Sequence, residues 1–131
     1  MKEIDVNSIS TKELYQYLTS SITPRPIALV STVDKEGNSN LSPFSFFNVF
    51  SIKPPILIFS PVNRVRDNTR KDTLNNITQV KECVIALVNQ NIAQQVSLAS
   101  SGYSADEDEF KKAGFSKIKA TCIQPYLIKE S

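Results

Sequence analysis

The sequence predicts a mainly β fold with helical excursions, and a small antiparallel barrel accounts for it best. Two observations lead to this prediction. The apolar runs are short and closely spaced, as β-strands are, and strands and helices do not alternate in the regular order that a doubly wound parallel sheet requires. A chain of 131 residues has the size of one domain, so we expect residues 1–131 to form a single domain.

A short helix is expected near the N-terminus. Ser10-Thr11-Lys12-Glu13 has the S-x-x-E form of a capping box, and apolar residues follow at helical spacing, which predicts a helix over about residues 11–19. Pro24 and Pro26 force extended backbone on the residues before them. The helix should therefore end before Pro24.

A β-hairpin is expected next. The apolar run 27–33 predicts a buried strand, and the polar segment 34–38, which includes Gly37, predicts a turn. The chain should reverse there into a second strand near 39–47, so the two strands would pair antiparallel.

The rest of the chain carries weaker signals of the same two kinds. Apolar and β-branched runs bounded by turn residues predict strands at 56–60, 83–88 and 123–128. Capping residues or helical spacing predict helices at 72–77, 91–100 and 106–113.

The composition excludes several classes of protein. Because the sequence has no histidine, neither Ser-His-Asp nor Cys-His catalysis is possible, and two isolated cysteines do not form a zinc cluster. We therefore expect no metal site. Gly37, Gly102 and Gly114 are too far apart for a GxGxxG or Walker A loop. A net charge of +2 is too small to indicate a nucleic-acid partner.

The sequence also lacks targeting signals of the common kinds. No run approaches the ~18 consecutive apolar residues that a transmembrane helix needs. The N-terminus, MKEIDVNSIS, has acidic residues where a secretory signal has a basic region followed by an apolar stretch. We expect a cytoplasmic protein without a membrane partner.

The segment 64–73 is the first candidate binding site. It holds four basic and two acidic side chains and runs into the predicted helix start. The backbone N–H groups and the positive dipole end of a helix N-terminus favour an anion, to which Lys71 adds a charge and Thr73 a hydroxyl. A phosphomonoester carrying about −2 charge fits such a site. The alternative is a solvated charged loop.

The segment 40–48 is the second candidate. Pro43 cannot donate a ladder hydrogen bond, so it should lie at a sheet edge or a bulge and leave backbone groups exposed beside aromatic side chains. Strict alternation places Phe44 and Phe46 on one face of the strand and Phe47 on the other. Such a segment suits a flat heteroaromatic ring, which it can contact with amide donors and a ring face. Ordinary core packing of the phenylalanines is the alternative.

Two further features carry no catalytic assignment. Cys83 lies in an apolar run and is expected to be an inert buried thiol, because a reactive one needs an accessible, electropositive setting. The acidic run 106–109 is explained as the first turn of a helix, where carboxylates complement the dipole. The sequence indicates no catalytic acid or base.

Five segments, taken in order, resemble the flavin reductase-like, flavoredoxin-type family. They are Pro24 to Thr32 (PRPIALVST), Asn40 to Phe47 (NLSPFSFF), Pro54-Pro55, Lys71-Asp72-Thr73 with Asn76-Ile77, and Asp108-Glu109-Phe110. No single segment is specific, but the five in this order are, and the resemblance covers about residues 15–131.

This resemblance implies an FMN-binding split β-barrel, usually a homodimer with the flavin near the subunit interface. The implied activity is the reduction of FMN by NAD(P)H, or onward electron transfer, through hydride transfer to flavin N5. The isoalloxazine ring and ribityl chain would lie against Asn40, Ser42, Pro43, Phe44 and Ser45. The phosphate end would be held by Ser60, Lys71, Asp72 and Thr73, and Arg25 would also contact the cofactor.

The chain departs from the family pattern at its C-terminus. Family members continue with further strands beyond the position of Ser131. We therefore expect the barrel to be incomplete at its C-terminal end, where the last strands of the family are missing.

Two other functions remain open at this point. One is an FMN-binding electron carrier without reductase activity. The other is a small barrel that binds single-stranded nucleic acid through Phe44, Phe46 or Phe47 and the basic segment 64–71. The flavoprotein interpretation involves only small molecules, a flavin and a nicotinamide, and no nucleic acid.

Overall fold

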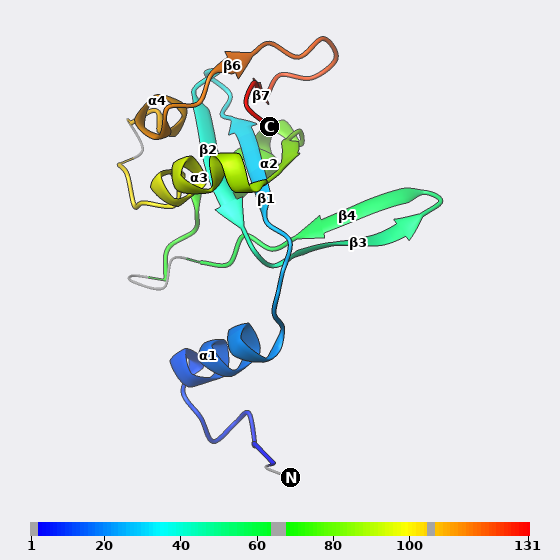
Figure 1. Ribbon diagram of the computed structural model, residues 1–131, viewed down its shortest axis with the longest axis vertical. Coiled ribbons are helices and arrows are strands. Elements are labelled where there is room, and N and C mark those ends of the chain that lie inside the picture. Colours follow the sequence, from blue (N-terminus) through cyan, green and yellow to red (C-terminus); the bar gives the residue numbers. More distant parts are fainter. Residues whose placement is uncertain (1–2, 64–67, 105–106) are drawn as a thin grey trace.

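The computed structural model describes residues 3–63, 68–104 and 107–131. Within these ranges strands outnumber helices, giving a mixed α/β fold (Figure 1). The helices are α1 (Thr11–Ser21), α2 (Asp72–Val80), the 3₁₀ helix η1 (Gln90–Ile92), α3 (Ala93–Ala99) and α4 (Glu109–Ala113). The strands are β1 (Ala28–Val33), β2 (Ser39–Phe44), β3 (Phe47–Ile52), β4 (Pro55–Phe59), β5 (Val84–Leu87), β6 (Lys117–Ile118) and β7 (Leu127–Ile128).

The central sheet is antiparallel, with the strand order β2-β1-β5. All six residues of β1 are buried, as expected for an apolar run that forms the middle strand of a sheet. The predicted hairpin of β1 and β2 is confirmed, with Ala28 opposite Phe44 and Val33 opposite Ser39. Its turn is closed by the N–H of Gly37, which donates to the carbonyl of Asp34 at 3.2 Å and has a positive φ of 87°.

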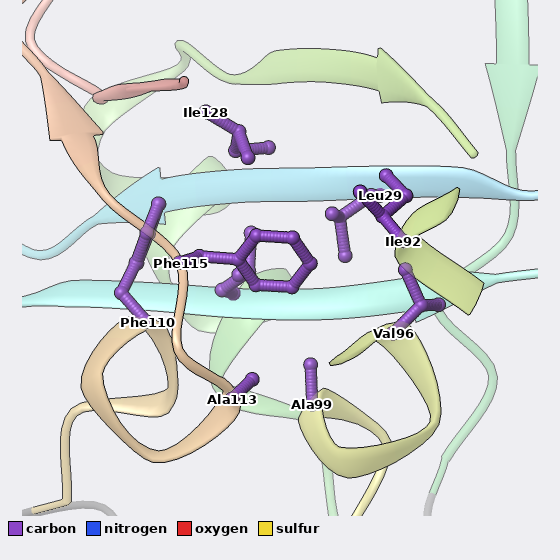
Figure 2. Packing of buried hydrophobic residues seen from close by; sticks show 9 residues of the cluster. Leu29, Ile92, Val96, Ala99, Phe110, Ala113, Phe115 and Ile128 are labelled. Atoms are coloured by element: carbon purple, nitrogen blue, oxygen red, sulfur yellow. The ribbon is translucent and has the colours of Figure 1, made fainter. Parts of the chain in front are cut away.

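The main hydrophobic core lies between this sheet and the two helices α3 and α4 (Figure 2). Leu29 and Leu41 face it from the sheet, and Val96 and Phe110 face it from the helices. Full burial of each such side chain contributes about 1.5–3 kcal/mol. This cluster therefore fixes the place of α4 against β2.

The opposite face of β1 packs against a second, smaller cluster. Ala28 and Val30 alternate with Leu29 along the strand and so point the other way, toward Phe44 and Phe47. Cys83 packs against this cluster, and burial raises the pKa of its thiol. The thiolate is thus disfavoured, although the side chain is only partly buried and not fully buried as expected.

Strands β3 and β4 form a separate two-stranded hairpin that extends away from the central sheet (Figure 1). We call β3 and β4 the arm. Helix α1 also stands apart, and none of its residues is buried. It begins at the predicted capping box, in which the Ser10 side chain accepts from the N–H of Glu13 while the Glu13 carboxylate accepts from the N–H of Ser10.

Several predicted boundaries were wrong. The strand predicted at 39–47 ends at Phe44, because the chain bends at 45–46 to enter the arm, where the Phe46 carbonyl accepts from the N–H of Ser60. The strand predicted at 123–128 is reduced to β7, since Pro125 cannot donate to a ladder. The helix predicted at 106–113 begins at Glu109, where the Asp108 side chain caps the N–H of Phe110.

The prediction of a barrel is only partly confirmed. The described strands lie in three separate sheets, and their hydrogen bonds do not close into a barrel. Strands β2 and β5 are the edges of the central sheet, and in the described ranges no other strand pairs with them. No helix in the same ranges is both long and apolar enough to cross a membrane.

Candidate functional site

Four segments that are far apart in the sequence surround a cavity of about 430 Å³, which we call the α2 cavity. They are residues 40–42 of β2, residues 69–73 at the start of α2, residues 99–103 after α3, and Glu109 of α4. The core between the sheet and α3 and α4 holds three of these segments in place. The cavity thus lies where the start of α2 meets the edge of the sheet.

Lys71 lies directly before the first residue of α2 and lines the cavity. Its carbonyl accepts hydrogen bonds from the N–H groups of Leu74 and Asn75, which begin the helix. Its Nζ lies 4.8 Å from the centroid of the Phe44 ring, a cation–π distance. A cation and the positive end of a nine-residue helix therefore lie beside the same cavity.

Thr73 differs from the sequence-based expectation. Its side chain is only 1% exposed, and its Oγ1 lies 2.9 Å from the amide group of Asn40. The Asn40 amide satisfies all its contacts in one orientation. Its oxygen then accepts from Thr73 Oγ1 at 2.9 Å and from the N–H of Leu41 at 3.2 Å, and its nitrogen donates to Glu109 Oε1 at 3.2 Å. The hydroxyl of Thr73 is thus used inside the protein.

These groups belong to a larger polar network, which we define as Thr32, Asn40, Thr73, Asn76 and Glu109; the first four are buried and Glu109 is partly buried. Asn76 Nδ2 donates to Thr32 Oγ1 at 3.1 Å, which joins α2 to the central strand β1. Asn40 joins the edge strand to α2 and, through Glu109, to α4. The network therefore fixes the start of α2 relative to the sheet.

The pKa of Glu109 is raised, chiefly by burial and further by the negative charges of Asp72 and Asp108. Hydrogen bonds from the backbone N–H groups of Glu109 itself and of Leu41 oppose this rise. From the sequence, Glu109 was expected in the first turn of a helix and in the Asp108-Glu109-Phe110 segment, without a role in a site. Its approach to β2 depends on tertiary packing, so no local pattern could have indicated it.

A second cavity of about 460 Å³ lies between the end of α1 and the arm, and we call it the arm cavity. Its walls are mainly apolar, with Arg25, Ser45 and Ser60 among the polar residues. Arg25 Nη1 donates to the carbonyl of Thr19 at 2.6 Å and to that of Ile22, so this side chain caps the end of α1. Its guanidinium lies 5.8 Å from the centroid of the Phe46 ring.

The structure divides the ten predicted site residues between these places. The α2 cavity is lined by Asn40, Ser42, Lys71, Asp72 and Thr73. The arm cavity is lined by Arg25, Ser45 and Ser60. Pro43 and Phe44 line neither cavity. Ser60 was expected beside Lys71 at the phosphate end, but the two residues line different cavities.

The predicted aromatic platform is wrong in one respect. Phe44 and Phe47 are both buried in the smaller cluster, and Phe44 lines neither cavity, whereas Phe46 and Phe47 line the arm cavity. The expected exposed edge is present, because Pro43 lies in the edge strand β2, opposite Leu29. The wall formed by residues 100–103 was not foreseen, since its Ser and Gly residues read as an ordinary loop.

The described residues contain no group of three or more Cys, Asp or Glu side chains placed to hold a metal ion. The α2 cavity and the arm cavity are therefore the candidate binding sites. Of the two, the α2 cavity combines a cation, hydroxyls, amides and a helix start.

The network generates a test of stability. Thr73→Ala removes a buried hydroxyl that is bonded to Asn40, so we expect the free energy of unfolding to fall by about 1–3 kcal/mol. Thr78→Ala in the same helix is the matched control, because its exposed hydroxyl bonds only to the carbonyl of Leu74, and it should change stability by less than about 0.5 kcal/mol. Urea unfolding measures both, and equal effects would contradict the role of the network.

Comparison with known proteins places this chain in a family. Residues 20–131 match the family described as flavin reductase like domain. The chain is 36% identical over 129 residues to an uncharacterized protein of Aquifex aeolicus, a match that covers 98% of this chain and 65% of the relative.

Solved structures agree. Nitrilotriacetate monooxygenase component B from Bacillus cereus superposes with a TM-score of 0.92 at 30% identity, covering 100% of this chain and 64% of that one. The 2-nitrobenzoate 2-nitroreductase NbaA of Pseudomonas fluorescens superposes with a TM-score of 0.83 at 28% identity, covering 99% and 61% of the two chains. The chain thus spans less than two thirds of these relatives. With the family match extending over most of its length, it belongs to the flavin reductase-like family.

Proposed function

We propose that this chain binds FMN and forms the flavin-binding part of an NAD(P)H-dependent flavin reductase. The observation that carries the proposal is the α2 cavity, in which Lys71 and the start of α2 lie beside polar groups of β2. Family membership supplies the class of cofactor.

The residues of the α2 cavity fit a phosphomonoester. Lys71 supplies a positive charge, the start of α2 a positive dipole end, and Ser42 a hydroxyl donor. Thr73, whose hydroxyl is used by the network, supports the wall and does not contact the phosphate directly. We therefore assign the phosphate to Lys71 and Ser42, with Asp72 holding the helix start.

The ring end of the cofactor is assigned to the neighbouring part of the edge strand. Residues 40–42 border the α2 cavity and residues 45–48 border the arm cavity, so the segment between them connects the two. The exposed edge of β2 at Pro43 offers backbone groups to ring carbonyls. Arg25, Ser45 and Ser60 would then meet the ring from the side of the arm cavity.

FMN, when bound, supplies the hydride acceptor, and the protein supplies its binding and orientation. No histidine or metal is required for this chemistry. The alternative of an FMN-binding electron carrier uses the same cavity and differs only in its reaction with a nicotinamide. The nucleic-acid alternative loses two of its three aromatic side chains, because Phe44 and Phe47 are buried and only Phe46 is partly exposed.

The test is an absorbance experiment. FMN added to the purified chain should acquire the shifted visible spectrum of a bound flavin, and NADH or NADPH should then bleach it. Bound flavin that no nicotinamide bleaches would favour the carrier. Absence of FMN binding at high micromolar concentrations would refute both flavoprotein functions.

Lys71 provides a test of the phosphate assignment. Lys71→Ala removes a charge-assisted contact worth about 1.5–3 kcal/mol, so FMN affinity should fall roughly tenfold to a hundredfold. Lys35→Ala, in the turn between β1 and β2, is the matched control and should leave affinity unchanged. Riboflavin lacks the phosphate and should be bound equally by both variants, and an equal loss of riboflavin affinity would show that Lys71 acts through folding.

We further propose that the chain forms a homodimer through the arm and α1. The arm exposes large apolar side chains on its strands, with Phe50 65% exposed and Ile52 90% exposed. Tyr17 and Leu18 of α1, and Ile22 directly after it, are also exposed. An isolated two-stranded hairpin is marginally stable in water, and apolar patches of this kind mark interaction surfaces. A symmetric second copy would cover them.

Sedimentation tests the dimer. The unmodified chain should sediment as a dimer at micromolar concentration, and Phe50→Glu should shift it toward the monomer by placing a charge in the apolar contact. Leu98→Glu is the control, since Leu98 is a half-exposed leucine on α3, outside the arm. A monomeric unmodified chain, or an equal effect of both substitutions, would refute the proposal.

A further inference from the structure

Glu109 is the acidic residue that the proposed function leaves unexplained. It is the first residue of α4, yet its carboxylate lies against the edge strand β2, with Oε1 3.2 Å from the amide nitrogen of Asn40. Its other oxygen, Oε2, is buried and has no hydrogen-bond partner among the described residues. A buried carboxylate oxygen without a hydrogen-bond partner is costly while the group is charged, so protonation of Glu109 lowers that cost.

Glu109 also borders two cavities. One is the α2 cavity, which it shares with Lys71, and the other is a polar cavity of about 240 Å³ on the far side of Asn40. A ligand anion beside Lys71 would therefore share the α2 cavity with the Glu109 carboxylate. Like charges that share a cavity at a protein surface repel more strongly than they do in bulk water.

The surroundings of Glu109 are on balance acidic. In the described part of the chain, the ionisable groups that face it from neighbouring elements, or share a cavity with it, are Asp108 of the α4 cap, Asp72 and Lys71 at the start of α2, Tyr103 after α3, and Asp34 and Glu36 of the turn between β1 and β2. Burial and two of these carboxylates already raise the pKa of Glu109. An added anion acts in the same direction.

We propose that Glu109 takes up a proton from solvent when an anionic group occupies the α2 cavity, so that binding of the FMN phosphate is linked to protonation of this carboxylate. The proton bonds to a Glu109 carboxylate oxygen, and the reverse transfer to solvent accompanies release of the anion. Glu109 is thus a positioning residue that sets the pH dependence of binding. The inference rests on the proposed FMN site.

Three proteins test this linkage. FMN affinity is measured from pH 5 to 8 for the unmodified chain, Glu109→Gln and Glu107→Gln. Glutamine keeps the shape and the acceptor for Asn40 but does not ionise. Glu107 is the matched control, because it lies two residues away and pairs with Lys112 at 2.6 Å without lining the α2 cavity.

FMN affinity of the unmodified chain should fall as pH rises through the ionisation of Glu109, and Glu109→Gln should remove that fall and bind FMN more tightly at pH 8. The phosphate of FMN titrates near pH 6, but it is common to all three proteins, so the difference between them isolates Glu109. Calorimetry in two buffers of different ionisation enthalpy should show less proton uptake for Glu109→Gln than for the other two proteins. Parallel pH profiles with equal proton uptake would overturn the inference and leave the FMN site standing.

A measurement on the unmodified chain guards against a variant that does not fold. The ¹³C carboxyl resonance of Glu109 should titrate at higher pH with FMN than without it. A tenfold preference of FMN for the protonated form corresponds to a rise of about one pH unit. An unchanged titration would overturn the inference, and failure of FMN to bind any of the proteins would overturn both this inference and the proposed function.

Discussion

The polar network of Thr32, Asn40, Thr73, Asn76 and Glu109 is the constraint on which the arrangement of the site depends. Its members come from four different elements, and each hydrogen bond joins two of them. Buried polar groups are costly when unpaired, so the elements can pack closely only in the one arrangement that pairs them. Apolar packing alone would hold α2 against the sheet but would tolerate small sliding motions. The network removes that freedom.

This constraint explains why Lys71 has a defined place. Thr73 is tied to Asn40 two residues after Lys71, so the start of α2 does not shift along β2. Phe44 then supports the lysine chain from below, with Nζ over its ring. The hydrogen bond between Thr73 and Asn40 thus fixes the backbone beside Lys71, and the Phe44 ring contacts its charged end. A surface lysine without these neighbours would sample many rotamers and define no site.

Local signals were sufficient for much of the fold. The capping box at Ser10, the apolar run of β1 and the turn at Gly37 each depend on residues near one another in the sequence, and all three were predicted correctly. The bend after Phe44 was missed because alternation continues through Ser45 and Phe46, and only the pairing of Phe46 with Ser60 ends the strand.

The site shows the same division. The helix start at Asp72 was predicted correctly from nearby residues, although no side chain caps this helix as the sequence had suggested. That Thr73 points into the protein depends on Asn40, 33 residues away, which no local pattern reveals. The separation of Ser60 from Lys71 and the approach of Glu109 to β2 depend in the same way on the packing of distant elements. Sequence order suggested the family, and tertiary structure decided which side chains share a cavity.

The walls of the α2 cavity come from residues 40–42, 69–73, 99–103 and 109, and this separation along the chain has a mechanical consequence. A molecule that touches all four walls acts as a non-covalent cross-link across two loops of about 25 residues and one of about five, whose closure in the unfolded chain carries an entropy cost that grows slowly with length. The binding free energy of such a molecule therefore raises the free energy of unfolding of the whole sheet and its helices, and not only the stability of one loop. A molecule bound in the α2 cavity would slow the opening of β2, α2 and α4 together, so a bound cofactor would also stabilise the fold.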